Sequence, residues 1–213
     1  MSYLLRVELP DVPGSLGRLA SAIGAAGANI EAIEIVGKDQ ADGVAIDDVF
    51  ITPDHGVMPD SIVSACTTLE GVRVLWISRY AAGGNLFLDL EAVESMTQDP
   101  TGSIVRLVDA VPDVFRVDWG VHLRRKGEDV VVEHGTPAAP SEVPTGVSWP
   151  ENLEKASRIT VPEQWSDLVV AGSPIDADEL VVIGRRGGPE FLDSEIARLA
   201  HLVAMAASLR RNA

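Results

Sequence analysis

The sequence predicts an α+β protein made of two domains with different architectures. The first eighty residues alternate between strand and helix patterns in the order β-α-β-β-α-β, which is the ferredoxin-like plan of a four-stranded antiparallel sheet with two helices on one face. The flexible stretch Ala81-Ala-Gly-Gly-Asn85 follows. The rest of the chain has another element order and ends in a long amphipathic helix. We therefore expect one domain over residues 1–80, a linker at 81–85 and a second domain over 86–213.

The elements of the first domain follow from local start and stop signals. Asp11 and Pro13 favour the start of a helix, and Gly27 favours its end. The pair Asp42-Gly43 indicates a hairpin before the next strand. The predicted strands are residues 3–9, 30–36, 44–52 and 71–79, and the predicted helices are residues 14–26 and 58–69.

The second domain has a more irregular pattern. Residues 136–150 contain four prolines and are expected to form a long loop. The predicted helices are residues 86–96, 102–111 and 191–210, and the predicted strands are residues 114–123, 129–133, 157–161, 168–174 and 179–183.

The charge balance argues against two classes of partner. The chain has 32 acidic and 17 basic residues, a formal net charge of −15. Such a surface repels nucleic-acid phosphates and anionic membranes, so we expect neither partner. No apolar run approaches the length of a membrane span, and no signal peptide is visible. A cytoplasmic location is expected, and the single cysteine, Cys66, is expected to be buried and inert.

Catalytic and metal-binding patterns are not found. The four histidines show no spacing typical of a metal site, and there is no nucleophile motif or phosphate-binding loop. The acidic groups at Asp47-Asp48 and Asp176–Glu179 are interpreted as solvated turns. We expect no catalytic residue, no metal and no cofactor. Four tryptophans are interpreted as core residues or, alternatively, as the aromatic wall of a pocket in the second domain; they are Trp76, Trp119, Trp149 and Trp165.

The turn after the first strand is the strongest candidate for a ligand site. Its backbone N–H groups lie at the start of a helix, where a carboxylate is attracted by unpaired donors and by the helix dipole. Gly14 permits close approach of a ligand to the backbone. In this hypothesis Asp11 binds an ammonium or polar group, and Asn29 supplies an amide across the site. The alternative is a plain helix start, in which Asp11 stabilises the helix by roughly 0.3–1 kcal/mol.

Residues 3–80 resemble an ACT domain. The resemblance rests on Leu9-Pro-Asp-Val-Pro-Gly-Ser-Leu16, on Gly27-Ala-Asn-Ile30 and on the order of elements. It implies a regulatory module that pairs with a second copy side by side and binds amino acids at the interface. Serine-binding members carry a histidine where this chain has Leu9, so the loop departs from that pattern. The positions that match the family's ligand site are Asp11, Val12, Gly14, Ser15, Leu16, Asn29 and Ile30.

Residues 86–211 resemble a degenerate GAF domain. The resemblance rests on residues 168–175, on residues 180–195 and on the closing helix. It implies a domain that encloses a small molecule or takes part in dimerisation. The Asn-Lys part of the cyclic-nucleotide signature is missing, and no cysteine lies in this half to hold a bilin.

The sequence therefore predicts a non-enzymatic regulatory protein. We expect a homodimer that binds an amino acid or similar small metabolite at the ACT interface and modulates an unidentified protein. One alternative is an assembly module whose ligand site is vestigial. Another is small-molecule sensing through the GAF-like domain.

Overall fold

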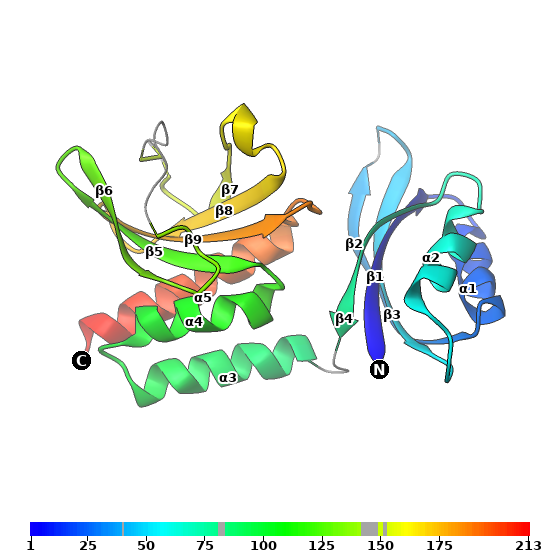
Figure 1. Ribbon diagram of the computed structural model, residues 1–213, viewed down its shortest axis with the longest axis horizontal. Helices are drawn as coiled ribbons and strands as arrows, with labels where there is room; N and C mark the ends of the chain where they lie inside the picture. The colour runs from blue at the N-terminus through cyan, green and yellow to red at the C-terminus, as the bar shows by residue number, and fades with distance from the viewer. Residues whose placement is uncertain (40, 81–83, 142–148, 151–152) are drawn as a thin grey trace. The chain divides into compact units, whose positions relative to one another are not determined.

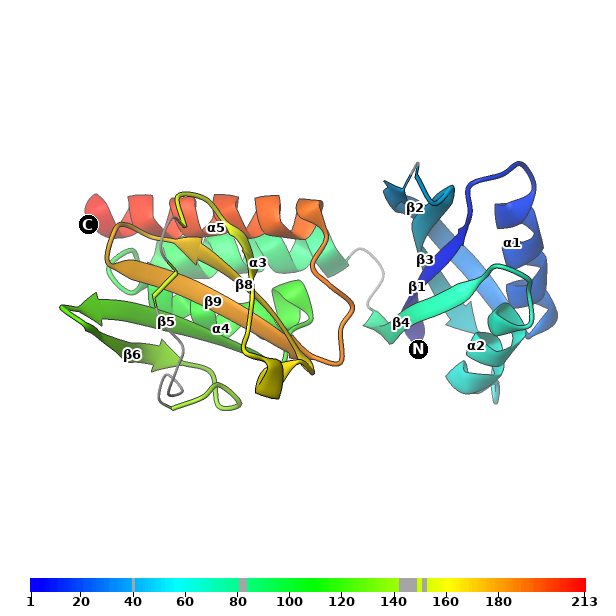
Figure 2. The same cartoon turned by 90° about the horizontal axis from the view of Figure 1, so that it is seen from above.

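The chain forms two compact units, residues 1–84 and 85–213, in a computed structural model (Figures 1 and 2). The structure describes residues 1–39, 41–80, 84–141, 149–150 and 153–213. Each unit contains its own antiparallel sheet. The predicted linker lies mostly outside the described residues, and a helix begins at its fourth residue, Gly84.

The first unit has the predicted ferredoxin-like order. Its sheet has the strand order β2-β3-β1-β4, with every pair antiparallel, and both helices cover one face (Figure 1). The expected fold is therefore confirmed. The elements are β1 (Ser2–Pro10), α1 (Ser15–Ala25), β2 (Ala28–Asp39), β3 (Val44–Pro53), α2 (Pro59–Thr67) and β4 (Arg73–Tyr80).

The core of the first unit lies between this sheet and its two helices. Leu19 and Ile23 of α1 lie one helical turn apart and are fully buried against Leu5, Val7 and other strand residues. Cys66 of α2 is buried in the same cluster, and burial raises the pKa of its thiol to about 11.

The second unit is a five-stranded antiparallel sheet with helices against one face. The strand order is β6-β5-β9-β8-β7. The elements are α3 (Gly84–Gln98), α4 (Ser103–Phe115), β5 (Trp119–Lys126), β6 (Asp129–Gly135), β7 (Ser157–Ile159), the 3₁₀ turn η1 (Glu163–Trp165), β8 (Leu168–Pro174), β9 (Glu179–Arg186) and α5 (Asp193–Arg211).

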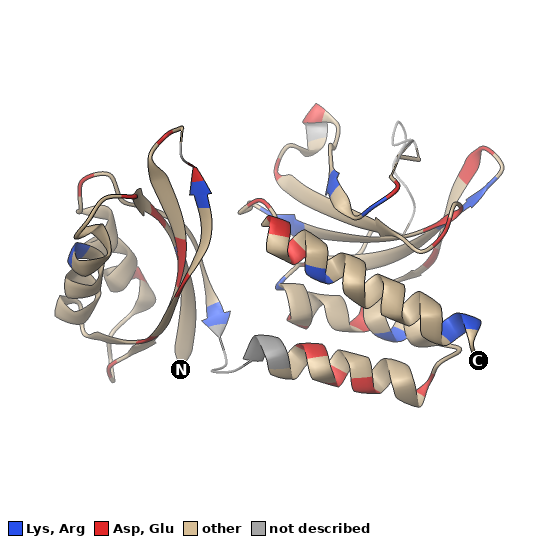
Figure 3. Cartoon of the chain, turned by 180° about the vertical axis from the view of Figure 1, so that it is seen from behind, with Lys and Arg blue, Asp and Glu red and all other residues tan. Residues whose placement is uncertain are grey.

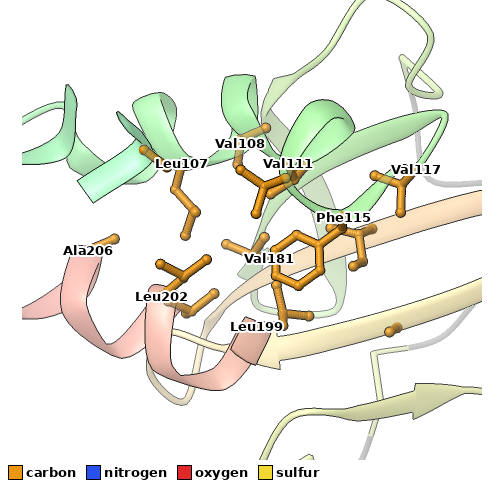
Figure 4. Packing of buried hydrophobic residues seen from close by; sticks show 14 of the residues in the cluster. Leu107, Val108, Val111, Phe115, Val117, Val181, Leu199, Leu202 and Ala206 are labelled. Atoms are coloured by element: carbon orange, nitrogen blue, oxygen red, sulfur yellow. The ribbon is translucent and has the colours of Figure 1, made fainter. Parts of the chain in front are cut away.

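The two faces of the second sheet are both apolar. Leu107, Val111 and Phe115 of α4 meet Leu199 and Leu202 of α5 in the larger cluster (Figure 4). On β9 the side chains alternate, so that Val181 and Ile183 join this helical cluster whereas Leu180 and Val182 join a second cluster on the opposite face. A sheet that is apolar on both faces needs cover on both, and Ala139, Trp149 and Leu153 pack against the second one.

Three expectations about individual segments are wrong at least in part. The strand predicted from Val114 begins at Trp119, because α4 continues through Pro112 and buries Val114 and Phe115 at helical spacing.

Both acidic groups differ from the solvated turns expected for them. The pair Asp47-Asp48 lies in the middle of β3 and is buried. In the second group Asp176 and Asp178 are exposed, but Glu179 is the first residue of β9 and is buried.

Candidate functional site

The candidate site is the turn that joins β1 to α1. Gly14 immediately precedes α1 and has φ 91°, a left-handed conformation that favours glycine. No side chain caps this end of the helix. The N–H of Asp11 donates to the carbonyl of Gly43 over 2.8 Å, which fixes the turn against the β2–β3 connection.

The helix start offers part of the expected set of donors. The N–H of Ser15 already donates to the carbonyl of Val12 over 3.2 Å, so it is engaged within the turn. Among the described residues, no acceptor is found for the N–H groups of Gly14 and Leu16. Together with the helix dipole, these two groups favour an anion at the turn.

Arg18 adds a positive charge that sequence reasoning missed. Its guanidinium donates to the Ser15 hydroxyl over 3.1 Å, and one of its nitrogens lies 3.9 Å from where a Cβ of Gly14 would be. The spacing of three residues from Ser15 places the two side chains on one helix face and was the available signal. The guanidinium strengthens the attraction of a carboxylate to this turn.

The predicted ammonium partner, Asp11, is paired in the structure. Lys38 at the end of β2 donates to both Asp11 oxygens, at 2.9 and 3.2 Å, and both side chains are about half exposed. An exposed pair of this kind contributes little stability. A ligand ammonium at Asp11 would therefore have to compete with Lys38.

Asn29 and Ile30 lie at the other end of the sheet. Asn29 is opposite Thr52 in the β2–β3 ladder, whereas Lys38 is opposite Ala45, the residue that also faces Leu9. The nine residues from Asn29 to Lys38 span roughly 30 Å of strand. Within one copy, the structure thus brings Asp11, Val12, Gly14, Ser15 and Leu16 together, but not Asn29 or Ile30.

Asp47 is a second residue that sequence reasoning missed. It is 2% exposed on β3, opposite Val7 and Ile35, and so shares the sheet face that α1 covers. Its Oδ1 has no hydrogen-bond partner among the described residues. Burial, reinforced by the nearby Asp11 carboxylate and partly offset by Lys38, raises its pKa.

The neighbouring acid has a different environment. Asp48 accepts two hydrogen bonds from the Arg6 guanidinium, at 2.7 and 2.8 Å. The pair is buried, with 4% and 8% of the two side chains exposed. Asp48 is thus paired on the opposite sheet face, whereas Asp47 lies on the face that α1 covers, near enough to Asp11 for the two charges to interact.

Elsewhere in the described part of the chain, histidines form hydrogen bonds with single carboxylates. His122 is bonded to Glu179 over 2.9 Å and His134 to Asp109 over 2.7 Å. No group of three or more potential metal ligands is found among the described residues. None of the described helices has the length and apolar character needed to span a membrane.

Several solved structures are similar to this chain. Among curated proteins, none matches the chain. Solved structures similar to it include the GAF domain of a phosphoenolpyruvate-protein phosphotransferase from Acinetobacter, 14% identical, with 60% of this chain and 92% of that chain covered and a TM-score of 0.46. Another is a GAF domain/HD domain protein from Geobacter sulfurreducens, 17% identical, with coverages of 62% and 97% and a TM-score of 0.37.

The first unit has a match at the level of sequence families. Residues 3–61 match the family model of the ACT domain, from the second residue of β1 into α2. The matched range contains the whole β1–α1 turn and both missed residues, Arg18 and Asp47. The first unit is therefore ACT-like in sequence as well as in fold, which supports a regulatory role that involves small-molecule binding.

Proposed function

We propose that this protein is a regulatory homodimer that binds an amino acid, or a similar small acid, at the β1–α1 turn. The observation that carries the proposal is the combination of groups at the turn: two N–H groups without an acceptor among the described residues together with Arg18, and the buried carboxylate of Asp47, which lies near enough to interact with the charge of Asp11. The first set suits a carboxylate. A nearby acid suits an ammonium, so the two together favour a zwitterion over a simple anion.

Dimerisation is proposed from the edge strand β2. Among the described residues of the unit, β2 pairs with β3 alone, and Ile35 on this strand is 57% exposed. A long unprotected edge is a template for pairing with another chain. Antiparallel pairing of two β2 strands about a two-fold axis would bring Asn29 of the partner subunit toward the turn, and this is how the predicted residue set would be completed.

A screen of the twenty amino acids by thermal unfolding tests the ligand. A compound at a hundred times its dissociation constant adds about 2.7 kcal/mol to the free energy of unfolding. We expect one or a few amino acids to raise the unfolding temperature, and no response to any of them would contradict amino-acid binding.

A pair of glycine variants tests the location. Gly14→Val should abolish the response because the side chain would occupy the approach to the turn. Gly56→Val is the matched control, since Gly56 has a similar φ of 86° and open space around it, so the backbone strain is comparable. A response that survives in Gly14→Val would place the ligand elsewhere.

The alternative is an assembly module with a vestigial site. It predicts a dimer whose mass and stability do not respond to any amino acid. Light scattering with and without the compounds of the screen separates the two functions.

A further inference from the structure

The connection between β2 and β3 contains the dipeptide Asp42-Gly43. Asp39 and Val44 face each other at the end of the ladder, so the residues between them reverse the chain. Asp42 and Gly43 are both exposed. Nowhere else in the sequence does a glycine follow an aspartate or an asparagine. The proposed amino-acid site makes no use of the Asp42 side chain.

The Asp42 carboxylate is not held by the turn in which it lies. Oδ1 of Asp39 accepts the N–H groups of Ala41 and Asp42, at 2.9 and 3.2 Å, so Asp39 is the side chain that stabilises this turn. Among the described residues, the Asp42 side chain has no hydrogen bond or ion pair. No such contact therefore competes with an approach of this carboxylate to the amide of the next residue.

The Gly43 nitrogen is accessible to that carboxylate. A Cβ built at Gly43 would meet no atom within 4 Å, so the space around the residue is open. Glycine itself has no Cβ beside the nitrogen, and this removes the steric barrier that other residues place there. No acceptor for the Gly43 N–H is found in the part of the chain that the structure describes.

We propose that Asp42 is a site of spontaneous isomerisation, and that the isoaspartyl product frees the β1–α1 turn from the β2–β3 connection. The observations that carry the proposal are the uncommitted Asp42 carboxylate, the unhindered Gly43 nitrogen and the bond from Asp11 to the Gly43 carbonyl. The turn becomes less ordered as the molecule ages. No ligand is involved, so this inference stands or fails apart from the proposed function.

The modification proceeds by ring closure and hydrolysis. The Gly43 amide nitrogen attacks Cγ of the protonated Asp42 carboxyl, so that an N–Cγ bond forms, a Cγ–O bond breaks and the amide proton leaves with the oxygen as water. The product is a five-membered succinimide. Water then opens the ring at the main-chain carbonyl carbon of Asp42, and the chain now runs through Cγ with the main-chain carboxylate released. One water leaves and one enters, so no other reactant is needed and the mass is unchanged.

The isoaspartyl linkage displaces the Gly43 carbonyl. It adds one carbon–carbon bond, about 1.5 Å of chain path, to a short connection whose ends are paired at Asp39 and Val44. The carbonyl accepts the Asp11 N–H over 2.8 Å. Because such bonds span only about 2.7–3.2 Å, this contact has little room to stretch. Its loss removes the bond that fixes the β1–α1 turn against the hairpin.

Heavy-oxygen labelling tests the modification. The folded full chain is kept for several weeks at neutral pH in water enriched in heavy oxygen and is then digested. Each passage through the succinimide adds one heavy oxygen, and electron-transfer fragmentation in the mass spectrometer separates isoaspartate from aspartate. We expect both signals to accumulate at Asp42.

Two controls accompany the labelling. Asp60 should stay unlabelled, because the N–H of the following residue, Ser61, donates to the carbonyl of Met58 over 3.1 Å at the start of α2. Asp42→Glu keeps the charge but would have to close a less favourable six-membered ring, so the variant should lose the signal. The chain unfolded in guanidinium shows that the assay detects the reaction.

Amide hydrogen exchange tests the structural consequence. The Asp11 amide should lose protection in the aged chain, whereas the aged Asp42→Glu variant should keep it. A folded chain that stays unlabelled at Asp42 while the unfolded chain becomes labelled would show that the hairpin prevents ring closure, and would overturn the proposal. Isoaspartate at position 42 with unchanged exchange at Asp11 would overturn the release of the turn.

Discussion

At the scale of single residues, the acids of β3 make opposite contributions to stability. Asp47 is a buried carboxylate whose Oδ1 has no hydrogen-bond partner among the described residues, and Asp48 is held by Arg6. We expect Asp47→Asn to raise the free energy of unfolding at pH 7 by about 1–3 kcal/mol, because it removes a buried charge that Lys38 offsets only in part. Asp48→Asn is the matched control and should lower it, because it leaves Arg6 poorly paired. Urea unfolding of the two variants measures the change in the free energy of unfolding that each substitution causes.

Asp47 also makes the free energy of unfolding depend on pH. The pKa of Asp47 is raised in the folded protein, from an ordinary value of 3.8. The folded state therefore holds the proton more tightly, and the contribution of Asp47 to stability falls as pH rises from about 3.8 through its folded pKa. Asp47→Asn should remove this part of the slope. If Asp47 also binds the ammonium of a ligand, Asp47→Asn should be more stable but should no longer gain unfolding temperature from amino acids. If Asp47 has a structural role alone, the variant should be more stable and should still respond to amino acids.

At the scale of elements, one carboxylate joins two strands to the end of a helix. Glu179 of β9 accepts hydrogen bonds from His122 of β5 and from Arg210 in the last turn of α5, at 2.9 and 2.7 Å. Arg124 approaches its other oxygen at 2.6 Å. Figure 3 shows the basic residues at the C-terminal end of α5, where they also complement the helix dipole. The junction thus fastens α5 to the sheet by charge as well as by apolar packing.

This junction predicts a loss of stability in mild acid. Burial, with the nearby Arg210 and Arg124 charges, lowers the pKa of His122 from its usual 6.5 despite the Glu179 bond. Although burial acts to raise the pKa of Glu179, its hydrogen bonds to Arg210 and His122 lower it overall. Stability is therefore expected to fall as pH drops below about 6.5, because the unfolded chain binds the proton more tightly. Unfolding curves between pH 7.5 and pH 5 measure the slope; His122→Asn should flatten it, and the same change at the exposed His201 should not.

The edge strand β2 gives a prediction about assembly. If two copies pair along β2, a charge at the exposed Ile35 should weaken the pairing. We expect Ile35→Lys to reduce the mass in solution toward the 22.6 kDa of one chain. Met58→Lys introduces the same charge at another exposed apolar residue, outside the sheet, and should leave the mass unchanged. Light scattering decides, and a persistent dimer in Ile35→Lys would exclude this edge as the interface.

At the scale of the whole molecule, two separate hydrophobic cores predict two independently folding parts. Among the residues that the structure describes, the cluster of the first unit contains no residue of the second unit, and the two clusters of the second unit contain no residue of the first. Fragments 1–84 and 85–213 should each give a cooperative thermal transition by circular dichroism. Failure of either fragment to unfold cooperatively would show that its core is incomplete.

The sequence predicts the architecture well where the pattern is strongly periodic or marked by turn residues. The order of the first unit and its antiparallel sheet follow from such patterns and are confirmed. Boundaries fail where one residue type suits two structures: Val114 and Phe115 favour strands, but the spacing from Val111 buries them in a helix.

The candidate site is harder to predict than the fold because it depends on register. The sequence suggests that Asn29, at the start of β2, lies near the β1–α1 turn. The ladder instead places the other end of β2, at Lys38, beside the end of β1 from which the turn starts. Asp47 and Asp48 are adjacent in sequence, yet alternation puts them on opposite faces of β3, where Arg6 holds Asp48 and Oδ1 of Asp47 has no hydrogen-bond partner among the described residues. Which of the two acids gains an ion pair is decided by Arg6, some forty residues away in the sequence. The local sequence pattern around the acids does not contain that information.

The burial of Cys66 makes thiol labelling a measure of local unfolding in the first unit. The thiol is fully buried in α2 and its pKa is raised to about 11, so it resists alkylation in the closed state. A thiol reagent can then react only during the moments when α2 has separated from the sheet, and the rate of labelling counts those openings. A ligand bound at the β1–α1 turn should lower the rate of Cys66 labelling. The decrease in that rate would then measure ligand binding in the full chain.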